Sequence, residues 1–132
     1  MPPNVEFSTP PDTMQPIGPY SHIAKVGQFI TIGGRAGVNP KSGELAGPDI
    51  ASQTRQILDM FKTMLASVGS DLDNIIHINV FLADMGDFSA MNAAYVQGLG
   101  DRRPARTVIA VTELPKPGAL VTMNLTAVTK AD

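Results

Sequence analysis

The amino-acid sequence predicts a single α+β domain over residues 1–132, with strands and helices in the order ββ-α-β-α-ββ. A length of 132 residues, 43% of them hydrophobic, suits one compact core and is too short for two ordinary domains. Two segments carry apolar residues at helical spacing, and the other apolar runs are short, as strands are. Two helices that cover one face of a sheet leave its other face to solvent or to a partner.

Prolines dominate the beginning of the chain. They stand at positions 2, 3, 10, 11, 16 and 19. Because proline has no N–H group to donate to a β-ladder, residues 1–15 are predicted to be an extended lead-in, with at most an edge strand near Val5–Ser8. Residues 22–33 form two short apolar runs on either side of Gly27-Gln28, a pattern typical of a β-hairpin.

Two later segments have the spacing of amphipathic helices. The first follows Asp49, a good N-cap residue, and Gly69 is expected to end it. Asp87 is expected to cap the second helix, which Gly98 and Gly100 would stop. The apolar residues that define the two helices are Ile50, Ile57, Leu58, Phe61, Met64, Leu65 and Val68, then Phe88, Met91, Tyr95 and Leu99.

The remaining strands are predicted in the second half of the chain. Ile75–Leu82 is almost wholly apolar, as expected of a central strand that is buried on both faces. Its faces are predicted to carry Ile76, Ile78 and Val80 on one side and His77, Asn79 and Phe81 on the other. Thr107–Val111 is a further strand, and Ala119–Val128 alternates apolar and polar residues like a half-buried strand. Apolar groups on both sheet faces favour self-association.

The composition argues against several classes of function. Ten basic and 12 acidic side chains give a net charge of −2, so nucleic acid is not expected as a partner. There is no cysteine, and His22 and His77 have no other ligand at metal-binding spacing, so no metal is expected. No apolar run approaches the roughly 20 residues that span a bilayer, and the first residues do not resemble a signal peptide, which predicts a cytoplasmic protein without a membrane partner.

Seven short segments, in register from about Pro16 to Val128, resemble the RidA/YjgF family. They are PIGPYS at 16–21, NPKSGE at 39–44, QT at 53–54, DMGDF at 84–88, N-x-x-Y at 92–95, PART at 104–107 and LPK at 114–116. The resemblance implies a chorismate-mutase-like fold, with two helices on one face of a mixed β-sheet. It also implies a homotrimer with ligand sites between subunits, which hydrolyses reactive 2-imino or 2-enamino acids to 2-oxo acids and ammonia without a cofactor.

Three positions match residues that the family uses at its ligand site. Arg106 stands at the substrate-binding arginine, whose guanidinium can grip a carboxylate through two parallel hydrogen bonds. Tyr20 matches a tyrosine that lines the pocket, although a tyrosine here can also pack within its own turn. Asn92 shares a helical face with Tyr95, where the pair either contacts the cleft or ties down a loop.

Two places depart from the family's pattern. Gly33-Gly34-Arg35 stands where Ser-Gly-Gln is common, so the serine hydroxyl is lost while the Gly34 backbone N–H remains a donor. Arg35 is either a second anion-binding group or a surface charge at the end of a strand. The family's water-positioning glutamate falls on Thr122, or on Asn124 if the alignment shifts by two residues, and neither side chain is a carboxylate base.

Three functions are therefore in competition. The first is a hydrolase like 2-iminobutanoate/2-iminopropanoate deaminase, in which Arg106 holds the carboxylate, Tyr20 and the Gly34 backbone shape the pocket, and Thr122 or Asn124 orients water. The second is a trimer that binds a 2-oxo acid or another small carboxylate with little or no catalysis. The third is a deaminase for a dicarboxylic enamine such as 2-aminomuconate, in which Arg35 meets the second carboxylate. A ribonuclease ranks last, because the sequence has neither a basic patch nor the aromatic platforms of RNA-binding proteins.

Overall fold

The computed structural model describes residues 4–131 and confirms the α+β class and the order of the elements. The strands are β1 (Glu6–Ser8), β2 (Ile23–Val26), β3 (Phe29–Ala36), β4 (Ile75–Leu82), β5 (Ala105–Ala110) and β6 (Val121–Val128). The helices are α1 (Ile50–Ala66) and α2 (Phe88–Leu99), and the 3-10 turns η1 (Leu72–Asn74) and η2 (Met85–Asp87) precede β4 and α2. Within the described residues, no helix has the length and apolar character needed to cross a membrane.

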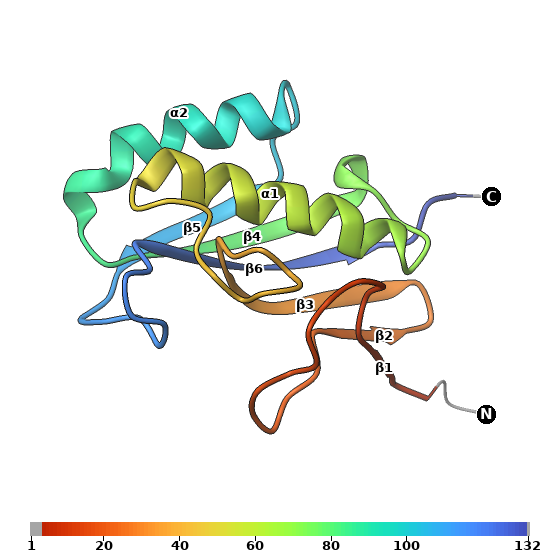
Figure 1. The fold of residues 1–132 in the computed structure, drawn as a ribbon. Helices are drawn as coiled ribbons and strands as arrows, with labels where there is room; N and C mark the ends of the chain where they lie inside the picture. The colour runs from red at the N-terminus through yellow and green to blue at the C-terminus, as the bar shows by residue number, and fades with distance from the viewer. Residues whose placement is uncertain (1–3, 132) are drawn as a thin grey trace.

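The six strands form one mixed sheet in the order β1-β2-β3-β6-β4-β5. Every neighbouring pair is antiparallel except β4 and β5, which are parallel and are connected through α2. The C-terminal strand β6 lies between β3 and β4, so it joins the two halves of the chain into one sheet. Both helices lie side by side on the same face of this sheet (Figure 1), as predicted.

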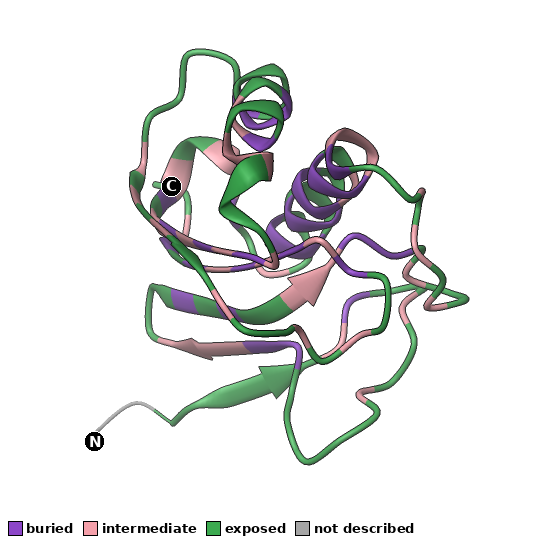
Figure 2. Cartoon of the chain, turned by 90° about the vertical axis from the view of Figure 1, so that its left-hand side faces the viewer, coloured by how far each residue is buried: buried purple, intermediate pink, exposed green. Residues whose placement is uncertain are grey.

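Helix α1 begins and ends much as its sequence predicts. The Asp49 carboxylate accepts a hydrogen bond from the Ser52 backbone N–H at 3.0 Å, which satisfies one of the free N–H groups of the first turn. The helix ends at Ala66, and Gly69 follows with a φ of +79°, a conformation that glycine adopts readily. The buried stripe of α1 faces the sheet and α2, whereas its other side is exposed (Figure 2).

Helix α2 differs from its prediction at both ends. Asp87 occupies the N-cap position, but its side chain makes no capping hydrogen bond; Asp84 instead accepts one from the Gly86 N–H at 2.7 Å in the preceding turn. Gly98 does not stop the helix. A Cβ atom there would lie 2.4 Å from Leu58 Cδ1, so this glycine allows α1 and α2 to approach closely. The helix ends one residue later, before Gly100 with a φ of +65°.

The prediction that β4 is buried on both faces is wrong. Its pairing with β6 shifts between Ile75 and His77, a β-bulge that turns the Ile76 side chain outward, where it is 44% exposed. Beyond the bulge, Ile78 and Val80 are buried beneath the helices, while the alternate residues of the strand are half-buried. The face of the sheet that the helices do not cover therefore remains partly accessible, and Phe29 (53% exposed) lies on it.

Candidate functional site

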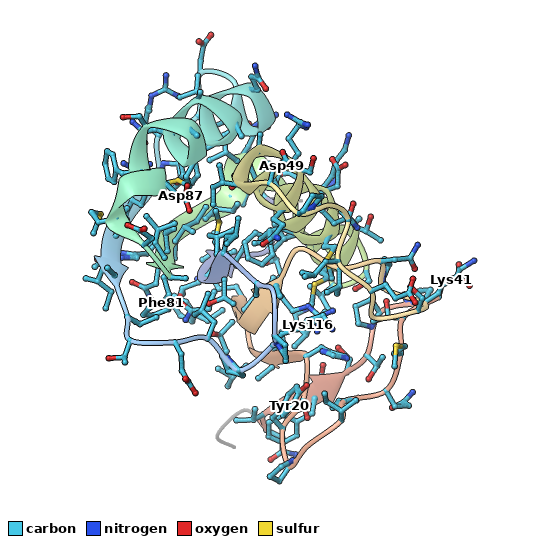
Figure 3. The ribbon with its side chains drawn as sticks, turned by 60° about the vertical axis from the view of Figure 1, so that its left-hand side comes forward. Tyr20, Lys41, Asp49, Phe81, Asp87 and Lys116 are labelled. Atoms are coloured by element: carbon cyan, nitrogen blue, oxygen red, sulfur yellow. The ribbon has the colours of Figure 1, made fainter. Side chains whose placement is uncertain are left out.

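A cavity of about 490 Å³ lies where the lead-in, the end of β3 and the β5–β6 loop meet. Tyr20, Arg35 and Thr122 line it, and so does Gly34, so four of the predicted site residues come together. Lys116 from the β5–β6 loop also lines the cavity. In Figure 3 Tyr20 and Lys116 are both found below the helices, on two segments that are almost a hundred residues apart in the sequence.

The guanidinium of Arg35 is held in this wall by a buried histidine. Its Nη1 lies 2.7 Å from His22 Nδ1, and His22 Nε2 lies 2.8 Å from the backbone oxygen of Met14. Because the Met14 carbonyl only accepts, His22 donates from Nε2 and accepts the Arg35 hydrogen at Nδ1, which is the neutral form of the ring. Burial, together with the charge of Arg35, lowers the pKa of His22 and favours this form, although the Met14 bond opposes the shift. The Tyr20 ring packs edge-on against the imidazole, with centroids 5.9 Å apart.

The cavity has positive charge and no negative side chain of its own. Within residues 4–131 no aspartate or glutamate lines it, whereas Arg35 and Lys116 do. Burial lowers the pKa of Arg35, the direction expected when a cation loses water without gaining a carboxylate. In the described part of the chain Arg35 forms no ion pair, and its buried Nε has no hydrogen-bond partner. The arrangement therefore favours the binding of a small anion.

The structure distinguishes between the two candidates for the glutamate position. Thr122 lines the cavity. Asn124, two residues further along β6, accepts a hydrogen bond from Asn79 Nδ2 at 2.8 Å and does not line the cavity. Of the two residues, only Thr122 lines the cavity, and its hydroxyl can donate and accept hydrogen bonds but cannot take a proton as a carboxylate does.

Gly33 and Gly34 lie where the pairing of β3 with β6 is irregular, between Ile32 and Arg35. The Gly33 N–H donates to the His22 carbonyl oxygen at 3.1 Å, and Gly33 itself does not line the cavity. A Cβ atom on Gly33 would lie 3.7 Å from the nearest atom, the Ser21 oxygen, which is an ordinary contact. Glycine is therefore not needed for space at this position, and a serine would fit the backbone.

Arg106 lies elsewhere, on the edge strand β5, and does not line the cavity. Its Nη1 donates to Asn92 Oδ1 at 2.7 Å, and its guanidinium carbon lies 4.8 Å from the Tyr95 ring centroid and 5.8 Å from that of Phe88. The cation thus rests on two aromatic rings of α2. One chain consequently carries the predicted site in two separate parts: the cavity, and Arg106 with Asn92.

The sequence did not identify three residues of these two parts. The sequence raises His22 only as a possible metal ligand, although this residue holds Arg35. It gives Lys116 only as part of a resembling segment, and Phe88 as part of such a segment and of the apolar face of the second helix. Each of these residues joins the site only through folding, which brings it next to residues from other parts of the chain. No local sequence motif therefore reveals it. Among residues 4–131 there is no group of three His, Cys, Asp or Glu side chains placed to hold a metal ion.

The chain is thus a small α+β domain with a positively charged cavity and, outside that cavity, a second arginine supported by aromatic rings. Comparison with known proteins identifies the family: the model described as Endoribonuclease L-PSP matches residues 11–129, and the chain belongs to this family, the RidA/YjgF family that the seven segments predicted.

Relatives along most of the chain agree with this assignment. A RutC family protein of Pyrococcus horikoshii is 43% identical over 77% of this chain and 81% of its own. A protein of Bos taurus named 2-iminobutanoate/2-iminopropanoate deaminase is 38% identical over 77% of this chain and 74% of its own. The crystal structure of the YjgF gene product from E. coli superposes with a TM-score of 0.82 at 33% identity, over 90% of this chain and 94% of that one.

Proposed function

We propose that this protein hydrolyses reactive 2-imino or 2-enamino acids to 2-oxo acids and ammonia, at a site shared between the subunits of a homotrimer. One observation carries the proposal: within one chain Tyr20, Gly34 and Thr122 line the cavity, whereas Arg106 lies outside it beside Asn92, so the arginine of the family pattern and the proposed water site do not meet in a single subunit. Relatives that are 37–38% identical are named 2-iminobutanoate/2-iminopropanoate deaminase. An arginine from one subunit facing the cavity of the next would complete the site.

The uncovered face of the sheet supports self-association. Phe29 and Ile109, which are 53% and 44% exposed, and the half-buried Phe81 are apolar groups that a second copy would bury. Polar pairs lie among them, such as His77 Nε2 with Thr107 Oγ1 at 3.1 Å. A face that is part apolar and part hydrogen-bonded is typical of the contact between subunits. Sedimentation at several concentrations would measure the proposed trimer.

The proposed role of Arg106 is to hold the substrate carboxylate. Asn92 engages one side of the guanidinium and the Tyr95 ring supports its plane, so the side chain loses little further freedom when a ligand binds. The N–H groups that Asn92 does not use can make two parallel, charge-assisted hydrogen bonds to a carboxylate. These contacts orient the C=N group toward the cavity of the neighbouring subunit.

The chemistry requires addition of one water molecule to the C=N carbon. The O–C bond forms as the nitrogen gains protons, and loss of ammonia from the carbinolamine leaves the 2-oxo acid. We assign the orientation of the water to the Thr122 hydroxyl and the Gly34 backbone N–H, with Tyr20 closing the pocket. A positioned general base contributes about 10²–10⁴-fold. The described cavity residues include no carboxylate, and both ring nitrogens of His22 are already hydrogen-bonded, so turnover is expected to be slower than with a carboxylate at position 122.

The absence of a carboxylate among the described cavity residues also favours a second candidate, a trimer that binds a 2-oxo acid without turning it over. An assay separates the two. An amino-acid oxidase generates 2-iminobutanoate in situ, and the rate of its disappearance is followed with and without the protein at micromolar concentration. Acceleration supports the deaminase, whereas binding of 2-oxobutanoate without acceleration supports the binding protein.

A further inference from the structure

We propose that the cavity binds a second carboxylate through Arg35, so that the preferred ligand is a dicarboxylic 2-imino or 2-enamino acid or its 2-oxo product. The inference rests on the proposed function for the identity of the reacting group. It goes beyond that function by naming the substrate class. The two ends of the ligand would then meet two different arginines, Arg106 at the reacting end and Arg35 at the far end.

The position of Arg35 supports this role. It lines a cavity whose volume of about 490 Å³ lies within the roughly 300–1,000 Å³ of typical small-molecule sites. Thr122, the residue assigned to the water, lines the same cavity. An anion held by Arg35 would therefore belong to the same ligand as the C=N group that the water attacks.

The Arg35 guanidinium is also held in position before any ligand binds. His22 accepts from Nη1 at 2.7 Å and is itself tied to the Met14 carbonyl at 2.8 Å. Besides Arg35, the imidazole contacts the Met14 carbonyl and the edge of the Tyr20 ring. Neither group carries a negative charge. An arginine held by a neutral partner keeps its full charge for a ligand, and little side-chain entropy is lost on binding.

Among the described residues, no carboxylate forms an ion pair with Arg35. Arg35 also lines a smaller cavity of about 250 Å³ that includes Asp12, Asp59 and Lys41, but it forms an ion pair with neither aspartate. Taking a cation out of water without a paired anion is costly, and such groups normally have a partner. A ligand carboxylate supplies that partner. Lys116 strengthens the preference for a dianion through its charge on the cavity wall.

The binding test uses succinate and butyrate, which have the same number of carbons and differ by one carboxylate. Titration calorimetry on the full-length protein is expected to show succinate binding at least tenfold more tightly than butyrate, because a hydrogen bond to a charged group contributes at least this much. In Arg35→Gln most of this preference should be lost, and Lys116 should account for what remains. Glutamine removes the charge, and because its side chain is shorter than that of arginine, the hydrogen bond from Nη1 to His22 is lost with it. Arg55→Gln, an exposed arginine of α1 outside the cavity, is the matched control and should keep the preference.

The catalytic test compares 2-iminosuccinate, made in situ from D-aspartate by an oxidase, with 2-iminobutanoate. Arg35→Gln is expected to lower kcat/KM for the dicarboxylic imine at least tenfold more than kcat/KM for 2-iminobutanoate, mainly through KM. Wild type that does not prefer succinate, or Arg35→Gln that loses both substrates equally while keeping its thermal midpoint, would overturn the inference.

Two further outcomes keep this inference distinct from the proposed function. Protein that turns over neither imine but still prefers succinate through Arg35 would refute the deaminase and leave the dicarboxylate site standing. Protein that turns over 2-iminobutanoate, but whose preference for succinate and 2-iminosuccinate is the same in wild type and Arg35→Gln, would refute the dicarboxylate site and leave the deaminase standing. If Lys116→Gln rather than Arg35→Gln abolishes the preference, the assignment to Arg35 is wrong.

Discussion

Two arginines of this chain are held in opposite ways. Arg106, on the edge strand β5, packs against the aromatic rings of Tyr95 and Phe88 from α2 and donates a hydrogen bond to the Asn92 amide oxygen. Arg35 is held in a cavity wall by the neutral ring of His22, and burial lowers its pKa.

The comparison shows what each environment is suited to do. An aromatic support stabilises a cation without neutralising it, so Arg106 stays charged and ready to bind. Burial of a guanidinium without a paired carboxylate costs free energy, and a bound anion offsets that cost. Arg35 is therefore expected to discriminate between ligands by their charge. Replacing residues around one arginine while the other stays intact therefore tests the two roles separately.

The largest effect is expected from Arg106→Ala. Loss of two charge-assisted hydrogen bonds to the carboxylate should weaken 2-oxobutanoate binding and lower kcat/KM about a hundredfold or more. Titration calorimetry and the in situ imine assay measure the two quantities. Arg102→Ala is the control, because that arginine pairs with Asp73 on the surface at 2.6 Å. Equal heats of binding for wild type and Arg106→Ala would remove this arginine from the site.

The next effect is an expected gain. Thr122→Glu places a carboxylate where water is proposed to be oriented, and turnover of 2-iminobutanoate should rise about ten- to a hundredfold, toward the contribution of a positioned base. The same carboxylate would lie in the cavity with Arg35 and compete for it, so succinate binding should weaken. Thr122→Gln, similar in size and without charge, should produce neither change. A glutamate variant that is no faster than wild type would argue that Thr122 does not face the reacting atom.

The sequence predicted the parts of the fold that depend on local periodicity. Helical spacing located both helices, and alternation located β6, because each pattern reflects one face packing on one core. The outward turn of Ile76 was not predictable, since the bulge arises where β4 meets β6, about fifty residues away. Gly98 was misread as a helix stop for the same reason: its role depends on contact with Leu58 of the other helix.

The candidate site was predictable residue by residue but not as a whole. Arg106 and Tyr20 were nominated from segments that match a family pattern, and nothing in those segments gives their separation on the folded chain. The hydrogen bond between His22, just before β2, and Arg35, near the end of β3, depends on an irregular register between β3 and β6, which a pattern of apolar residues does not encode. Charge balance around a cavity likewise emerges only when the cavity's residues are brought together.

The smallest expected effect concerns pH. Burial lowers the pKa of His22 below its ordinary value of 6.5, so the folded protein binds fewer protons at this site than the unfolded chain does just below pH 6.5. Stability contributed by the neutral ring is therefore present above about pH 6.5 and is lost as the pH falls through the folded-state pKa.

Urea unfolding at pH 7.5, 6.5, 5.5 and 4.5 measures the free energy of unfolding for wild type and His22→Asn. Asparagine keeps an acceptor for Arg35 and loses the bond to Met14, so this variant should be about 1 kcal/mol less stable at pH 7.5. The difference in free energy of unfolding between wild type and His22→Asn should shrink toward pH 4.5, because only wild type has to protonate the buried ring. A difference that stays constant across the series would show that His22 does not couple proton binding to folding.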